Sequence, residues 1–391
     1  MKQNKTLLVI TPHFLAFVHD QVIEMAKFYS KIYVIVVHPK ILKFQPKKTK
    51  ISNKIKIDTN NLPSNVRIFE TSYLAIPGKP FQHLRGNSSY KKVVRIINRN
   101  NIKFDLIHSH FLWPAGFVGA KLKEKHNVPC IVTGHGYDVY DLPFRNNKWK
   151  TRISKILTHT DAIITVSRQN EKLLTRLTSK KIFVIPNGYN STIFTVDPRN
   201  KKKMLALPDN KKIILSVGNL ELVKGHEYLV SAVEKIIQKN QNIYCVIVGG
   251  GSRHSFLEKL IKQKGLEKFI RLIGAVQPEE VPNWMNACDV YIQPSIKESF
   301  GIVLLEALSC GKPVIGTAVG GIKEIINEKV GYLVPSGDEN ALSEAILKSL
   351  NHEWDKGYIL DYVKFYTWEN IISKTINIHN NMLILYNDNG S

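Results

Sequence analysis

The chain has 391 residues, of which 43% are hydrophobic, and it carries a formal net charge of +23 at pH 7. This composition excludes a disordered chain, the length suits two or three domains, and no apolar run approaches the ~20 residues that span a bilayer. The start of the chain does not resemble a signal peptide, and the four cysteines lack CxxC spacing, which indicates buried or incidental thiols in a reducing compartment.

Short apolar runs alternate with amphipathic stretches through the first half of the chain. Strands are predicted at 6–10, 31–37, 66–70, 106–108, 130–133, 162–166 and 182–185. Helices are predicted at 18–29, 90–98, 116–126, 149–157 and 168–177. Residues 39–65 are polar and rich in lysine, which predicts a long surface loop. Strands that alternate with helices predict a parallel sheet with helices on both faces.

A second set of elements follows the break at Pro186-Asn187-Gly188 and a polar linker at 190–209. Strands are predicted at 213–217, 243–248, 270–272, 290–293, 313–316 and 331–334. Helices are predicted at 226–238, 256–265, 281–287, 303–309, 322–326, 341–350 and 368–386. The sequence therefore predicts two doubly wound α/β domains that join near residue 187. Because ligands of such sheets bind at the carboxyl ends of the strands, we expect the two domains to face each other across one cleft.

The charge is divided unequally between these two halves. Residues 1–195 contain 32 Lys and Arg against 10 Asp and Glu, a net charge of +22, whereas residues 196–391 contain 23 against 22, a net charge of +1. Such an asymmetry predicts different partners for the two domains, and an anionic one for the first.

The strongest chemical signal is a pair of glutamates, Glu298 and Glu306, in the segment that follows the strand 290–293. Between them, Phe300-Gly301-Ile302 opens a helix, whose free backbone N–H groups favour an anion. A carboxylate in the loop and another on the helix can both face a polyhydroxylated ligand. Taken alone, two glutamates at this spacing are usually solvated helix charges.

Glycines and a lysine follow other strands of the second half. Gly218-Asn219 comes after the strand 213–217, and Lys224-Gly225 precedes the next helix. A glycine turn lets the backbone approach a phosphate, and an ammonium group supplies a point charge. The Walker A pattern is absent, so this is not a P-loop. The turn at 249–251 fits either a ligand approach or a flexible loop, and the glycine pair at 320–321 is typical of a turn that allows a close approach.

These motifs resemble those of the retaining glycosyltransferases of family 4, which have the GT-B fold of two Rossmann-like domains. The resemblance covers nearly all of 185–340: Glu298 to Glu306 is similar to the Glu-x7-Glu motif, and Gly218 and Lys224 are similar to the glycine turn and the diphosphate-binding lysine. In the first half, residues 133–138 resemble the histidine loop of that family.

The resemblance implies two domains and a role for each site residue. Residues 1–187 would form the acceptor-side domain, with a C-terminal helix at about 370–391 packing back on it, and residues 188–369 the donor-binding domain. The implied catalytic residues are His135, Glu298 and Lys224, with His135 at the sugar and Lys224 at the leaving diphosphate. The implied donor site consists of Gly218, Asn219, Lys224, Glu298, Phe300, Gly301, Ile302 and Glu306, and the acceptor side of His110, Tyr137 and Asp138.

Two departures from the family pattern bear on the donor and acceptor sites. Asn219 stands where the family often has an arginine that contacts the diphosphate, which leaves Lys224 as the main cation, with Arg253 or Arg271 as supplements. The first N-terminal loop, at 11–19, lacks the usual pair of glycines.

No metal site is predicted. An Asp-x-Asp motif is absent, and His108-Ser109-His110 has no third ligand at matching spacing. Lys224 would then neutralise the diphosphate in place of a divalent cation. We expect His108 to be structural and His135 to be functional.

The basic half predicts a membrane surface more strongly than nucleic acid, because no nucleic-acid-binding motif is present. Residues 40–56 and 81–99 combine lysines and arginines with apolar residues, a pattern that can dock on anionic lipid. A solvated basic face and coding bias are the alternatives.

These features and the resemblance together predict a cytoplasmic, metal-independent, retaining glycosyltransferase, which would be peripheral on the inner face of the membrane if its basic half docks on lipid. It would move a hexose or N-acetylhexosamine from a UDP- or GDP-sugar to a glycan or lipid-linked acceptor, in the synthesis of a cell-surface polysaccharide or glycolipid. Two alternatives share the fold and the donor site: a nucleotide-sugar epimerase, and a non-catalytic sugar-nucleotide-binding protein.

Overall fold

Parallel pairing of the predicted strands builds two separate sheets. The structure is a computed structural model that describes residues 3–41, 62–76 and 78–388. The chain divides into two units, which we call unit 1 (residues 1–186 and 371–391) and unit 2 (residues 187–370). Two doubly wound α/β domains are therefore confirmed.

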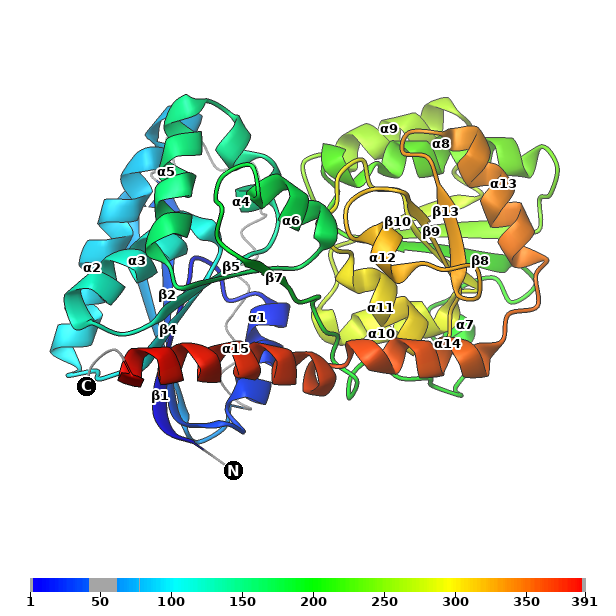
Figure 1. The fold of residues 1–391 in the computed structure, drawn as a ribbon. Helices are drawn as coiled ribbons and strands as arrows, with labels where there is room; N and C mark the ends of the chain where they lie inside the picture. The colour runs from blue at the N-terminus through cyan, green and yellow to red at the C-terminus, as the bar shows by residue number, and fades with distance from the viewer. Residues whose placement is uncertain (1–2, 42–61, 77, 389–391) are drawn as a thin grey trace. The chain divides into compact units, whose positions relative to one another are not determined.

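Unit 1 contains a seven-stranded sheet with the order β3-β2-β1-β4-β5-β6-β7, and the paired strands run parallel (Figure 1). Its strands are β1 (Gln3–Thr11), β2 (Tyr29–Ile41), β3 (Val66–Ala75), β4 (Leu106–His110), β5 (Cys130–Gly134), β6 (Ala162–Thr165) and β7 (Ile182–Val184). Most of them are continuous apolar runs, as expected for strands that are covered on both faces.

The longer helices of unit 1 cover the two faces of this sheet. On one face, α2 (Arg85–Arg99) and α3 (Phe117–His126) bury Val93, Ile97, Val118 and Leu122 against alternate residues of β1, β2 and β4, with α5 (Asn147–His159) beside them (Figure 1). The opposite face carries α1 (Ala16–Met25) and the last helix, α15 (Trp368–Asp388). Shorter helical segments fill the connections: η1 (Lys79–Leu84), η2 (Leu112–Gly116), α4 (Tyr137–Tyr140), η3 (Leu142–Phe144) and α6 (Arg168–Leu174).

Polar contacts tie α15 to unit 1, to which the chain belongs from Ile371 onward. The hydroxyl of Tyr386 donates to the Asp161 carboxylate at 3.1 Å, and His379 reaches both Tyr29 and His108. The last helix is therefore part of the core of the unit that the N-terminal residues build.

Unit 2 contains a six-stranded sheet with the order β10-β9-β8-β11-β12-β13, whose paired strands are again parallel. Its strands are β8 (Lys212–Val217), β9 (Ile243–Val248), β10 (Ile270–Gly274), β11 (Val290–Gln293), β12 (Val314–Thr317) and β13 (Gly331–Val334). Its helical elements are α7 (Lys201–Met204), η4 (Leu222–Lys224), α8 (His226–Ile237), α9 (His254–Gln263), η5 (Pro278–Glu280), α10 (Val281–Ala287), α11 (Ile302–Ser309), α12 (Ile322–Ile325), α13 (Glu339–Leu350), α14 (Lys356–Val363) and η6 (Lys364–Tyr366).

The core of unit 2 lies between the sheet and α8, α9 and α13. Leu229, Val233 and Ile236 of α8 pack with Ile214 and Ile247 of the sheet in one buried cluster. The opposite face is covered by α10, α11 and α12 (Figure 1). In both units, loops follow the carboxyl ends of the strands.

Three expectations from the sequence are corrected by the structure. Residues 39–41 belong to β2 and not to a loop, because their pairing with β3 continues to Ile41. The linker at 190–209 contains the short helix α7, which begins where the Asn200 side chain accepts from the Lys203 N–H. Helix α14 has no predicted counterpart. Most of the expected lysine-rich loop, residues 42–61, lies outside the described residues.

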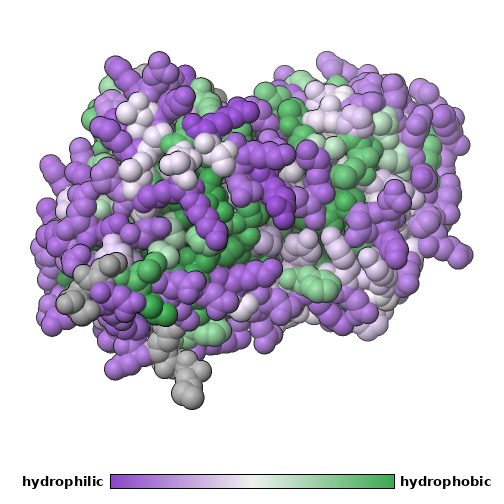
Figure 2. Space-filling model, in the orientation of Figure 1, coloured by the Kyte–Doolittle hydropathy of each residue, from purple (hydrophilic) through white to green (hydrophobic). Residues whose placement is uncertain are grey.

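On the face drawn in Figure 2, hydrophilic residues predominate and hydrophobic residues gather in smaller areas between them. Within the described ranges, none of the helices has the length and apolar character needed to cross a membrane. All four cysteines are buried and free, as the sequence predicts.

Candidate functional site

In each sheet the strand order reverses at the first strand of the unit, β1 or β8. The predicted site residues follow these strands or the strands beside them. In unit 2, β9 lies on one side of β8 and β11 on the other, and in unit 1 β1 separates β2 from β4. In open α/β sheets the crevice for a ligand forms at the carboxyl ends of such strands. Each unit therefore carries one candidate half-site.

In unit 2, the predicted lysine and one predicted glutamate form an ion pair. Lys224 Nζ lies 2.6 Å from Glu298 Oε2, with 28% and 13% of the two side chains exposed. Lys224 comes from η4, beyond the end of β8, and Glu298 from the loop after β11. The adjacent order of β8 and β11 in the sheet brings together two residues that are 74 positions apart.

Other donors fix the Glu298 carboxylate. Gln293 Nε2 donates to Oε2 at 2.8 Å, and the Ser299 backbone N–H donates to Oε1 at 3.0 Å. The loop itself is tied to η4, because the Ile296 backbone N–H donates to the Val223 carbonyl at 2.8 Å. The carboxylate therefore keeps hydrogen-bond donors even when the Lys224 ammonium moves to another anion.

Two glycines at this edge have opposite surroundings. Gly225 has a left-handed backbone with φ of 64°, and a side chain there would collide with the Pro294 carbonyl, so the close approach of η4 and the loop after β11 requires glycine. At Gly218, by contrast, nothing lies within 4 Å of the position that a Cβ would take. The space over Gly218 is open to a ligand.

The second glutamate and the predicted backbone donors lie on the next element. Phe300 is buried, Gly301 is the left-handed N-cap of α11, and Ile302 begins that helix without a side-chain cap. Glu306 is half-buried in the second turn of α11. Its charge, like that of Glu298, adds to burial in raising the pKa of Tyr291 well above the ordinary value, so both glutamates act on the same buried phenol.

The substitution of asparagine for arginine leaves Lys224 as the cation nearest to Glu298. Asn219 is exposed beside Gly218. Arg253 instead pairs with Glu227 at 3.3 Å and covers the ring of Phe256. Arg271 occupies the second position of β10, at the amino end of that strand and away from the edge where Lys224 lies.

In unit 1, the predicted histidine, His135, contacts three aromatic rings. His135 Nε2 lies 3.0 Å from His110 Nδ1, and the two rings stack with centroids 5.2 Å apart. Phe17 and Phe111 contact the His135 ring with centroid distances of 4.8 and 4.9 Å. Both rings are buried, His110 completely and His135 with 7% of its surface exposed.

Burial keeps these imidazoles neutral. It lowers the pKa of His135 to about 3 and that of His110 well below the ordinary value, and the neighbouring histidines act in the same direction. At neutral pH, His135 is therefore a hydrogen-bonding group without charge. It can hold a hydroxyl group, but it does not supply a positive charge to a phosphate.

The other two acceptor-side residues differ in exposure. The buried Asp138 carboxylate accepts from the backbone N–H groups of Leu112 and Gly136, both at 2.8 Å, so it holds two loops together. Tyr137 is 42% exposed, with Arg145 over its ring and its hydroxyl 3.3 Å from Gln82. Among these residues Tyr137 offers the accessible side chain.

Within the described ranges, no group of three or more His, Cys, Asp and Glu is arranged to hold a metal ion.

Family models match both halves of the chain. The model of Glycosyltransferase Family 4 matches residues 54–192, and the model of Glycosyl transferases group 1 matches residues 197–358. A relative described as an uncharacterised glycosyltransferase, from Methanocaldococcus jannaschii, is 30% identical over 295 residues, which cover 71% of this chain and 75% of the relative. The chain belongs to the glycosyltransferase family.

Solved structures agree with this family in fold. Sucrose-phosphate synthase from Thermosynechococcus elongatus superposes with a TM-score of 0.79 at 23% identity, covering 98% of this chain and all of that one. HepE from Anabaena in complex with UDP superposes with a TM-score of 0.74 at 20% identity, covering 96% of this chain and all of that one. The predicted GT-B fold is confirmed. The prediction that the chain is a glycosyltransferase is confirmed as well.

Three residues of the half-sites were missed by the sequence reasoning. Gln293 ends β11, and a polar residue at the carboxyl end of an apolar strand was an available signal. Tyr291, whose hydroxyl donates to the Val217 carbonyl at 3.2 Å, gave no signal, because an aromatic residue in a strand is ordinary. Phe17 belongs to the N-terminal loop predicted at 11–19, but no sequence motif indicated that it would contact His135.

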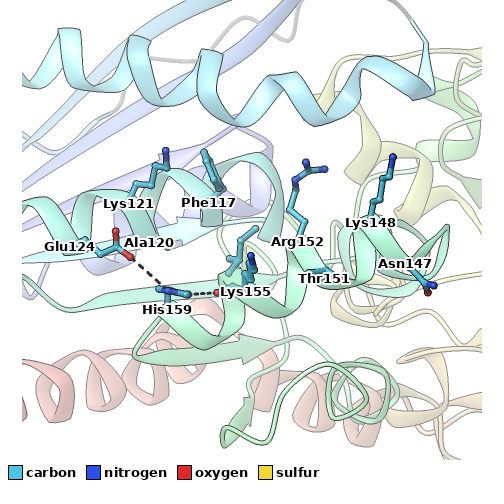
Figure 3. Close-up of a pocket in the computed structure, with 11 residues that line it drawn as sticks. Phe117, Ala120, Lys121, Glu124, Asn147, Lys148, Thr151, Arg152, Lys155 and His159 are labelled. Carbon is cyan, nitrogen blue, oxygen red and sulfur yellow. Dashed lines mark hydrogen bonds and ion pairs between the residues drawn. The ribbon is translucent and has the colours of Figure 1, made fainter.

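A cavity of about 620 Å³ between α3 and α5 of this glycosyltransferase contains none of the predicted site residues (Figure 3). Four cations line it, Lys121, Lys148, Arg152 and Lys155, around an apolar floor that includes Phe117. Among the described lining residues, Glu124 is the one carboxylate, and it lies 3.9 Å from His159. Arg152 covers the rings of Trp113 and Trp149. We call this cavity the α3–α5 groove.

Proposed function

We propose that this glycosyltransferase transfers a hexose or N-acetylhexosamine, with retention of configuration, from a nucleotide-diphosphate sugar to a glycan or lipid-linked acceptor of the cell surface. The observation that carries the donor proposal is the Lys224–Glu298 pair at the strand-order reversal of unit 2, beside the open space over Gly218. The UDP complex of the Anabaena structure supports testing UDP-sugars before GDP-sugars.

The roles proposed for unit 2 follow from charge. The Lys224 ammonium would neutralise the leaving diphosphate, and the uncapped start of α11 would add backbone N–H groups near Phe300, Gly301 and Ile302. Glu298 would accept from a hydroxyl group of the sugar, and Glu306 from the ribose. Gly218 and Asn219 would let the backbone approach the diphosphate.

The roles proposed for unit 1 follow from exposure and neutrality. His135, which burial keeps uncharged, would hydrogen-bond the sugar that is transferred. Tyr137 would contact the acceptor, while His110 and Asp138 would support the histidine loop from behind. For the chemistry we propose front-face attack, in which the leaving phosphate accepts the proton of the acceptor hydroxyl.

A thermal-shift panel of UDP- and GDP-sugars tests the donor site. A donor at a hundredfold excess over its dissociation constant stabilises the fold by about 2.7 kcal/mol. We expect one series to raise the melting temperature, and Lys224→Met and Glu298→Gln each to remove the shift. Lys264→Met is the matched control, because Lys264 and Glu234 form a similar pair elsewhere in unit 2, with 25% and 34% exposure.

Turnover separates the proposed transferase from its two alternatives. Release of the nucleotide that depends on an acceptor and is unchanged by EDTA supports a metal-independent transferase. Interconversion of the donor sugar without acceptor would identify an epimerase, and tight donor binding without nucleotide release would identify a binding protein. In the transferase, His135→Ala and Glu298→Ala should each lower turnover strongly while the fold survives.

We also propose that unit 1 docks on anionic lipid. The residues that carry this proposal differ in part from those expected from the sequence: Val93 and Ile97 of α2 are buried in the core, and the lysines from Lys43 to Lys56 lie outside the described residues. Exposed apolar side chains occur instead around η1, at Leu74, Ile76, Phe81 and Leu84. The α3–α5 groove adjoins η1 through Trp113, whose Nε1 donates to the Gln82 carbonyl at 3.2 Å.

Cosedimentation with vesicles tests this surface. We expect binding to anionic phosphatidylglycerol vesicles at low salt and little binding to neutral phosphatidylcholine vesicles, since each cation near such a surface contributes about 1 kcal/mol. Lys148→Glu with Lys155→Glu should weaken the binding more than Lys262→Glu with Lys268→Glu in unit 2. Equal binding to both kinds of vesicle, or stronger binding to duplex DNA, would reject the proposal.

A further inference from the structure

A chain of buried polar side chains leads from the last helix to the sheet of unit 1. The hydroxyl of Tyr29 lies 2.8 Å from His379 Nδ1, and His379 Nε2 lies 3.1 Å from His108 Nδ1. His108 Nε2 in turn lies 2.8 Å from the Thr133 hydroxyl. All four side chains are buried, and the two ends of the chain are hydroxyl groups.

This chain can be fully hydrogen-bonded with both rings neutral. A neutral imidazole has one N–H donor and one acceptor nitrogen, while a hydroxyl both donates and accepts. Each group can therefore donate to the next one from Tyr29 to Thr133, or each can donate in the opposite direction. In either case every ring nitrogen of His379 and His108 has a hydrogen-bond partner. Burial, which lowers the pKa of both histidines, agrees with this neutral state.

The same rings continue to the candidate histidine. His108 and His110 lie two residues apart on one face of β4, and their rings stack with centroids 4.5 Å apart and 22° between the planes. His110 then hydrogen-bonds His135 and stacks on it. The ring of His108 is thus fixed on one side by His379, and on its other side it supports the pair that contains His135.

Within the described structure, the hydrogen bond to His110 is the one that the His135 ring makes. His135 Nδ1 and His110 Nε2 are buried and lack a hydrogen bond within the described structure. The one bond between the two rings requires that one of them donates, so one open nitrogen carries a proton and the other does not. The tautomer of His110 therefore decides which nitrogen of His135 carries the proton.

We propose that His379, on the last helix, is a positioning residue for His135. The inference rests on the proposed function, in which His135 contacts the transferred sugar. An apolar side chain at position 379 would fill the same space but leave His108 Nδ1 and the Tyr29 hydroxyl without partners. A buried polar group without a partner is unfavourable, which favours movement of the His108 ring or entry of water.

The experiment compares three variants of the full chain. His379→Phe keeps an aromatic ring, of somewhat larger volume, and removes both hydrogen bonds. His379→Gln retains a group that can reach His108. Thr375→Val is the matched control one turn earlier on α15: Thr375 is equally buried, but its hydroxyl has no partner in the described structure.

The first measurement is of the histidine ring nitrogens by NMR on 15N-histidine-labelled protein, with His135→Asn used for assignment. We expect separate signals from the two His135 nitrogens in the unaltered chain and in Thr375→Val, as in one fixed tautomer. In His379→Phe these signals should shift toward each other, as in an exchanging ring, and His379→Gln should restore them in part. A side chain that only stabilised the fold would not change the tautomer of a distant ring.

The second measurement is steady-state transfer at a temperature where each variant is folded. Misplacement of the sugar-contacting group should lower kcat about ten- to hundredfold in His379→Phe, with the donor KM nearly unchanged and with partial recovery in His379→Gln. Where His379→Phe fails to fold, Tyr29→Phe removes only the far hydroxyl, and it should disturb the His135 signals in the same direction.

Unchanged His135 signals in every folded variant would overturn the inference. Its failure is distinguishable from that of the proposed function: His135→Ala with full activity removes the role of His135, whereas the NMR result on His379 does not depend on activity.

Discussion

The Lys224–Glu298 pair is built so that a stronger anion can take the lysine. A Lys–Glu pair with this partial exposure contributes little to stability, about 1 kcal/mol or less. When the ammonium turns toward a diphosphate, the Glu298 carboxylate still accepts from Gln293 and from the Ser299 N–H. The pair therefore positions a mobile cation without making the fold depend on it.

Gly218→Ala separates the donor site from the stability of unit 2. Because nothing lies within 4 Å of the new methyl group and the backbone is not left-handed, the fold should be unchanged or more stable by about 0.4 to 1 kcal/mol. The methyl group would stand where the diphosphate approaches, so we expect donor affinity to fall about tenfold, equivalent to 1.4 kcal/mol. Urea unfolding and donor titration by calorimetry measure the two effects.

Gly225→Ala is the control for that variant. Its left-handed backbone and the Pro294 carbonyl should make the same substitution destabilising by about 1 to 3 kcal/mol. If both substitutions changed the free energy of unfolding equally, the difference between Gly218, with open space beside it, and Gly225, which packs on a carbonyl, would be contradicted.

At the scale of elements, the first residues of unit 2 are held by η6 and by the residues that lead into the last helix. The Tyr189 backbone N–H donates to the Tyr366 carbonyl at 3.0 Å, and Tyr189 bridges Thr367. A side chain at Gly188 would collide with the ring and backbone of Trp368. The glycine of the Pro-Asn-Gly segment is thus required by packing, within unit 2.

Gly188→Ala should therefore destabilise unit 2. Overpacking of this kind costs about 1 to 3 kcal/mol, and we expect the urea midpoint to fall accordingly. Trp368→Leu alone should also destabilise, but Gly188→Ala combined with Trp368→Leu should lose less than the sum of the two, because the smaller side chain relieves the collision. Strictly additive losses would place the strain elsewhere.

The sequence predicted elements better than it predicted their contacts. Apolar periodicity located β9, β11 and β13 with the bounds that the structure has, since these strands are buried between polar turns. It missed α14 because no family motif and no clear apolar stripe marked residues 356–363. Residues near one another in the chain, such as Glu298 and Glu306, were found from spacing. The hydrogen bond between His379 and His108 could not be found, because the two residues are 271 positions apart in the chain.

At the scale of the whole molecule, the buried histidines are distributed unequally. His108, His110, His135 and His379 are buried in unit 1, whereas unit 2 buries His226. Burial lowers the pKa of His108 and His135 to about 3 and that of His226 to about 4, with the charge of Lys224 adding to the last. The two units should therefore respond differently to acid.

Unit 1 should lose stability before unit 2 as the pH falls. A histidine with a lowered folded pKa binds fewer protons in the folded state, so its contribution is complete above pH 6.5 and is lost as the pH falls toward the folded value. Each histidine contributes up to about 1.4 kcal/mol per pH unit in that window. Urea titrations at about pH 7 and about pH 5, with hydrogen exchange resolved by unit, measure this. A larger loss in unit 2 would contradict it.

The return of the last helix to unit 1 has a consequence for synthesis in the cell. Tyr29 and His379 are 350 residues apart, so at a ribosomal rate of 5 to 20 residues per second the tyrosine waits about 20 to 70 s for its partner. All of unit 2, which is continuous in the chain, is translated within that interval. The later domain can thus finish folding while the earlier one still exposes an uncovered sheet face, and a chaperone that protects apolar surface would find its substrate there during translation.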